Sequence, residues 1–72
     1  MNKKYLIIIE KTETGYSAYS PDLEGCVATG SSKSAVENNI RDAIEFHLKG
    51  LHMEGFKIPD PKSYSKYIEF AA

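Results

Sequence analysis

The chain has 72 residues, of which 42% are hydrophobic and 26% are charged, and its formal net charge is −1. This length suits one domain with a small core, and the balanced charge provides no basic surface of the kind that binds nucleic-acid phosphates. A single cysteine excludes an internal disulfide and suits a reducing compartment. We therefore expect residues 1–72 to form one soluble cytoplasmic domain, without a signal peptide or a membrane-spanning segment.

Two segments near the N-terminus have the composition of β-strands. Residues 5–10 (YLIIIE) contain three consecutive isoleucines, which is more apolar surface than one helix covers. We therefore expect this strand to contact a second copy of the chain in a homo-oligomer, a dimer or a tetramer. A polar loop then leads to residues 15–20 (GYSAYS), where strand alternation places Tyr16 and Ala18 on one face and Tyr19 on the other.

A turn and a third strand are predicted over residues 20–29. Pro21 fixes its own φ, and the carboxylate of Asp22 can accept a hydrogen bond from the backbone two residues on, which is typical of a tight turn. Gly25 gives the backbone freedom to enter the next strand. Residues 26–29 (CVAT) are short, apolar and partly β-branched, as in a half-buried strand, so we expect their cysteine to pack in the core.

A long helix is predicted from residue 33 to residue 52. Its N-cap is either Ser32 or Ser34, the latter in a capping box with Glu37, and Gly55 is the expected stop. Apolar residues recur three and four positions apart and form one stripe toward the sheet: Val36, Ile40, Ala43, Ile44, Leu48 and Leu51. The opposite face is polar and contains Asn38, Arg41, Asp42, Glu45 and Lys49.

The remaining residues predict a connector and a final strand. Residues 56–61 include two prolines, which resist helix formation, and residues 64–70 (YSKYIEF) are rich in aromatic and β-branched side chains. The predicted fold class is α+β: a three-stranded antiparallel meander, one long helix on one sheet face, and a final strand beside the meander, in the order β-β-β-α-β.

Taken together, these motifs resemble the N-terminal domain of HicB-type antitoxins, which has a partial ribonuclease-H-like fold. The resemblance covers residues 5–70 and lies in Gly15-Tyr16-Ser17-Ala18, Pro21-Asp22-Leu23-Glu24-Gly25-Cys26, Gly30-Ser31-Ser32, Ala43-Ile44 and Pro59-Asp60-Pro61. Glu24 and Ser34 depart from the proline and the acid that are common in that family. Residues 1–72 as a whole are thus expected to be a HicB-like domain.

The resemblance implies a non-enzymatic domain that binds a small HicA-type toxin, a ribonuclease with a double-stranded-RNA-binding-like fold, and covers its catalytic histidine. Many HicB-type proteins also have a C-terminal DNA-binding segment. Because this chain stops two residues after the predicted final strand, no direct DNA binding is expected.

Candidate partner-binding residues are an exposed tyrosine and acids that complement a basic toxin. Tyrosine is enriched at protein interfaces, and opposite charges speed encounter between partners. The candidates are Tyr16, Asp22, Glu24, Glu37, Asp42 and Glu45.

Other function classes stay open at this point. Tyr16 and Tyr19 on an open sheet would stack nucleic-acid bases, and converging carboxylates would support a metal-dependent nuclease. An oligomeric domain that has lost its toxin is a further alternative. However, the helix acids lie on a solvated face, and His47 and His52 do not share a helix face. We therefore expect no catalytic, metal-binding or cofactor-binding residues.

Overall fold

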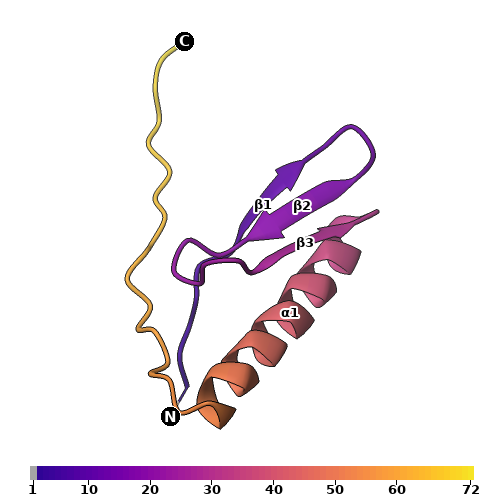
Figure 1. The fold of residues 1–72 in the computed structure, drawn as a ribbon. Helices are drawn as coiled ribbons and strands as arrows, with labels where there is room; N and C mark the ends of the chain where they lie inside the picture. Colours follow the sequence, from indigo (N-terminus) through magenta and orange to yellow (C-terminus); the bar gives the residue numbers. More distant parts are fainter. Residues whose placement is uncertain (1) are drawn as a thin grey trace.

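The computed structural model describes residues 2–72, which form a three-stranded sheet and one helix (Figure 1). The strands are β1 (Ile8–Lys11), β2 (Tyr16–Tyr19) and β3 (Val27–Gly30), and the helix α1 spans Lys33–Met53. The sheet order is β1-β2-β3, and both strand pairs are antiparallel. The predicted meander followed by one long helix is therefore confirmed, as is the α+β class.

The register places the core on one face of the sheet. Ile9 lies opposite Ala18 on β2, which in turn lies opposite Ala28 on β3, and directly opposed residues share a face. α1 packs on this face against β3 and β2, where Ala18, Val36 and Ile40 are buried. Tyr19 pairs with Ile8 and Val27 on the other face, as the alternation predicted.

The first strand is shorter than the predicted residues 5–10. β2 ends at Tyr19, which pairs with Ile8, and the chain then turns at Ser20. Residues 5–7 consequently have no opposing residues on β2, so the β1–β2 pairing begins only at Ile8. The third strand begins one residue later than predicted, and Cys26, which precedes it, is buried in the core as expected.

Both ends of α1 are capped by local hydrogen bonds. The amide of Ala35 donates to Ser32 Oγ at 3.0 Å, so Ser32 is the N-cap and the alternative at Ser34 is not used. At the other end Gly55 adopts a φ of +78°, its amide donates to the carbonyl of His52, and the amide of Phe56 donates to that of Leu51. This is a Schellman motif, and it confirms Gly55 as the stop.

The predicted final strand beside the meander is wrong for the chain described here. Residues 56–72 are extended but belong to no strand (Figure 1). Among residues 2–72, they pair with none of the three strands of the sheet. The yellow end of the chain instead leaves the body. It raises the radius of gyration to 14.1 Å, whereas a compact chain of this length has about 11 Å.

Candidate protein-binding site

An open groove separates α1 from β1 and from the segment that leads into it. The groove has a volume of about 740 Å³. Its apolar lining comes from both sides and consists of Tyr5, Ile7, Ile9, Ile40, Ile44, Leu48 and Ile58. It exists because α1 packs over β3 and β2, which leaves the helix-facing side of β1 uncovered. The isoleucine run therefore does expose more apolar surface than α1 covers, and Ile9 is 36% exposed.

The rim of this α1–β1 groove is charged. Glu37, Arg41 and Glu45 project from α1, and Lys3 lies on the other side. Lys3 Nζ lies 2.6 Å from Asp60 Oδ1. This hydrogen bond raises the pKa of Lys3 and lowers the pKa of Asp60. Since Lys3 is paired with Asp60, the groove residues on α1 contribute two carboxylates, Glu37 and Glu45, and one arginine, Arg41, so the rim is negative by one charge.

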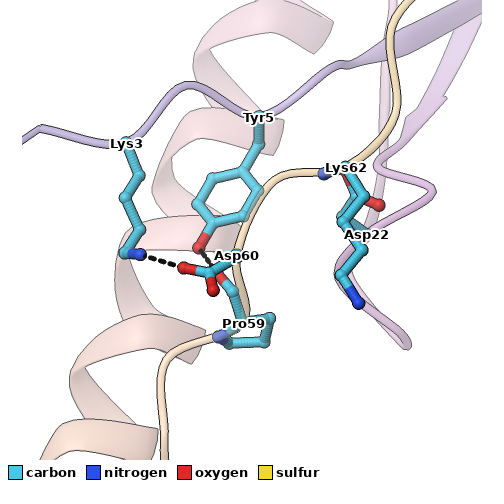
Figure 2. A network of polar contacts seen from close by, with 6 residues as sticks. All are labelled: Lys3, Tyr5, Asp22, Pro59, Asp60 and Lys62. Atoms are coloured by element: carbon cyan, nitrogen blue, oxygen red, sulfur yellow. Dashed lines mark hydrogen bonds and ion pairs between the residues drawn. The ribbon is translucent and has the colours of Figure 1, made fainter.

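The connector after α1 is held to the N-terminal segment at one end of the groove. Figure 2 shows Lys3 and Tyr5 pointing toward Pro59 and Asp60. The hydroxyl of Tyr5 donates to the carbonyl of Pro59, and Lys3 donates to Asp60. These contacts join residues more than fifty positions apart, and no local pattern in the sequence indicated them.

Asp22 fixes the connector at a second point. One of its oxygens accepts from the amides of Lys62 at 3.0 Å and Ser63 at 2.9 Å, and the other accepts from Ser63 Oγ at 3.0 Å. The hydrogen bond from the Ser63 amide, followed by that from Lys62, lowers the pKa of Asp22. The sequence suggested a local turn role for this carboxylate, but the structure shows it bonding forty residues away. We call these contacts the Asp22 clamp.

The predicted partner-binding residues do not form one cluster. Glu37 and Glu45 lie at the rim of the groove, whereas Asp42 is exposed elsewhere on α1 and Glu24 is exposed in the β2–β3 loop beside Asp22. Tyr16 is half-buried against the core, and Lys11 Nζ lies 4.9 Å from the centre of its ring. Because Tyr16 and Tyr19 are on opposite faces, they do not make one stacking surface.

Within residues 2–72, no three histidine, cysteine, aspartate or glutamate side chains come together in a way that could hold a metal ion. Cys26 is buried as a free thiol, and this burial raises its pKa. A thiol in that state is a poor nucleophile. No helix in the same part of the chain combines the length and the apolar character needed to cross a membrane. The surface of residues 2–72 does include the apolar α1–β1 groove with its charged rim.

The family follows from the order of the strands and helix together with the match of the sequence. A family model described as the HicB-like antitoxin of bacterial toxin–antitoxin systems matches residues 5–71. The chain belongs to the HicB-like antitoxin family. Its resemblance to HicB-type proteins, seen in the Pro21–Cys26 motif and the glycine before the helix, is thereby confirmed.

Two solved structures of HicB-type proteins have the same fold. The HicA3 and HicB3 toxin–antitoxin complex contains a chain with a TM-score of 0.69 and 37% sequence identity, matched over 82% of this chain and 70% of that one. The structure of the antitoxin HicB3 gives a TM-score of 0.68 and 37% identity, over 79% of this chain and 42% of that one.

Relatives are also found among phage and bacterial sequences. A 14.9 kDa protein from the rep-hol intergenic region of Haemophilus phage HP1 is 34% identical over 64 residues, which are 89% of this chain and 48% of that protein. A UPF0150 protein of Helicobacter pylori is 45% identical over 47 residues, 65% of each chain. The chain thus spans about half the length of the phage relative and less than half of HicB3.

Proposed function

We propose that this HicB-like antitoxin binds a small HicA-type toxin and neutralises it by covering its active site. The observation that carries the proposal is the likeness, in both sequence and fold, to a HicB3 chain whose structure was solved together with the toxin HicA3. The match covers 82% of this chain at 37% identity, with a TM-score of 0.69. Because function depends on the binding surface rather than on the fold alone, the proposal needs a test at that surface.

The toxin-contacting surface in this proposal is acidic. Asp42, Glu37 and Glu45 are exposed on α1, and Glu24 is exposed in the loop beside Asp22. Carboxylates at the rim of an interface attract a basic partner and raise the association rate. Salt screens this attraction, so the association rate falls as the salt concentration rises. Tyr16 contributes its partly exposed side chain, with Lys11 Nζ over its ring, and Asp22 contributes by holding the connector in place.

The proposed role is non-enzymatic and requires no metal or cofactor. Steric occlusion of a ribonuclease needs a stable, complementary surface rather than reacting groups of the antitoxin's own. We place the protein in the cytoplasm, where a toxin that cleaves RNA would meet its substrate. We assign no DNA contact to residues 1–72, since their basic and acidic residues are interleaved along the chain.

Binding can be tested with the toxin that co-purifies with the tagged full chain from its own cells. Once that toxin is purified, its association rate with the chain is measured at low and at high salt. The double variant Asp42→Lys/Glu45→Lys is expected to slow association roughly tenfold or more at low salt, with little difference at high salt.

A control variant separates this surface from net charge. Glu13→Lys/Glu54→Lys changes the total charge by the same amount at two exposed sites, one in the β1–β2 loop and one at the end of α1. This variant should associate nearly as fast as the unaltered chain. Equal slowing by both variants would refute the α1 surface, and failure to bind any HicA-type toxin would refute the proposed function itself.

A further inference from the structure

The C-terminal arm, residues 64–70, is an extended and largely apolar segment that pairs with no strand within residues 2–72. Tyr64 is 85% exposed, Tyr67 101%, Ile68 67% and Phe70 79%. Within the described part of the chain, the hydrogen bonds to the connector end at Ser63, held by Asp22, and Figure 1 shows the yellow arm leaving the rest of the molecule. So large an apolar exposure in so few residues marks an interaction segment.

The pattern of the arm is that of a strand with one apolar side. In extended backbone, alternate residues share a side, so Tyr64, Lys66, Ile68 and Phe70 face one way and Ser65, Tyr67 and Glu69 face the other. A segment with this alternation suits the edge of a sheet that has an uncovered apolar face.

The body of the same chain offers such an edge. β1 is at the edge of the sheet, so one side of its backbone is unpaired, and the α1–β1 groove lies on its helix-facing side with Ile7, Ile9 and Leu48 in its lining. A strand added beside β1 would place alternate side chains over this groove. At the other edge α1 already packs against β3, and the hollow formed by β2 and β3 is about half as large, at about 360 Å³.

We propose that the arm of one chain pairs with β1 of a second copy and fills its α1–β1 groove, while the arm of the second copy does the same in return. This exchange goes beyond toxin binding and does not depend on it. It gives a closed two-fold dimer in which each chain supplies one arm and one groove.

Two observations favour a second copy as the occupant of the groove. The Asp22 clamp fixes the base of the arm, and from there the arm points away from its own body instead of returning to it. The charge also matches, because Lys66 lies on the apolar side of the arm and the groove rim on α1 has two carboxylates, Glu37 and Glu45, for one arginine, Arg41. Lys66 of the arm would thus bring a positive charge to the negatively charged rim of the second copy's groove.

The test is sedimentation equilibrium of the full chain and of three double variants. The arm variant is Ile68→Ser/Phe70→Ser, and the groove variant is Ile9→Ser/Leu48→Ser. The control, Val27→Ser/Phe46→Ser, removes side chains that are 69% and 81% exposed and belong to neither the arm nor the groove. Circular dichroism verifies that each variant retains the helix.

The unaltered chain and the control are expected to be dimers, and the arm and groove variants are each expected to dimerise at least a hundredfold more weakly. An equimolar mixture of the arm variant and the groove variant should form a heterodimer, because one intact arm still meets one intact groove. A monomeric unaltered chain would overturn the proposal, whether its own arm or a toxin then occupies the groove. So would an arm variant that dimerises as well as the unaltered chain, or a mixture that forms no heterodimer.

Discussion

At the scale of single residues, Asp22 connects parts of the chain that are far apart in sequence. Its carboxylate accepts two backbone amides and one hydroxyl from residues 62 and 63. Charge-assisted hydrogen bonds of this kind are stronger than neutral ones. The aspartate therefore determines where the connector ends and where the arm begins, while its position in a Pro-Asp motif indicates only a turn.

Asp22→Asn is expected to loosen the connector without unfolding the core. The amide side chain has one oxygen and no charge, so the Lys62 and Ser63 amides should exchange with solvent several-fold faster, while those in α1 stay as they were. Hydrogen exchange followed by NMR measures this. Glu24→Gln removes the same charge from an exposed neighbour and serves as the control. Unchanged exchange at Ser63 in the Asp22→Asn variant would contradict the clamp.

The clamp also predicts a direction of pH dependence. The pKa of Asp22 is lower in the folded chain than in the unfolded one, so its contribution is complete above the ordinary pKa of an aspartate. It is lost as the pH falls through the lowered value, because protonation removes the charge that the amides bond to. Amide protection at Ser63 should therefore decline in acid before the α1 amides lose theirs.

At the scale of elements, the contact between β3 and α1 depends on the absence of a side chain at Gly30. A Cβ at this position would lie 2.5 Å from the backbone nitrogen of Val36 and 2.8 Å from its Cα. Since both atoms belong to the helix backbone near its start, neither can move aside as a side chain would. The glycine lets the strand lead into the helix at close range.

Two glycine-to-alanine substitutions should therefore have opposite effects. Gly30→Ala is expected to lower the free energy of unfolding by about 1–3 kcal/mol, because the helix must shift away from the sheet. Gly50→Ala, where a Cβ would meet open space in the last turns of α1, should raise it by roughly 0.5–1 kcal/mol through helix propensity. Urea titration followed by circular dichroism compares them. A neutral Gly30→Ala would show that the close approach is not required.

The elements predicted best from the sequence are those that local patterns determine. The helix from residue 33 was visible in its three-and-four spacing and ended at Gly55 as expected, since the Schellman motif is built from neighbouring residues. The choice between Ser32 and Ser34 was not decided by the sequence because both have the right spacing. The final strand could not be predicted in the same way, since a strand needs a partner, and residues 64–70 pair with no strand among the residues that the structure describes.

At the scale of the whole molecule, α1 provides two different surfaces. One side lines the groove beside β1 with Ile44 and Leu48, and Asp42 lies outside that lining. Glu37 and Glu45 lie at the border between this groove and the proposed toxin surface. The groove exists because α1 packs over β3 and β2 and leaves the helix-facing side of β1 uncovered. This placement of the helix is known only from the tertiary structure. The isoleucine run indicated uncovered apolar surface, but neither its shape nor its charged rim could be read from the sequence.

Arm exchange makes the stability of the molecule depend on its concentration. Because unfolding would separate two chains, dilution favours the unfolded state. The melting temperature is expected to rise by roughly 5 °C or more over about a hundredfold increase in concentration. Circular dichroism in cells of different path length measures this directly. A melting temperature independent of concentration would mean that the chain unfolds as a monomer.

A titration of toxin activity shows directly whether the chain blocks the active site of the toxin. The co-purified HicA-type toxin is incubated with RNA and increasing amounts of the full chain, and cleavage is measured. If the chain occludes the active site, cleavage should fall linearly and stop when every toxin molecule has one antitoxin chain bound. Cleavage that continues when the toxin is fully bound would contradict occlusion of its active site.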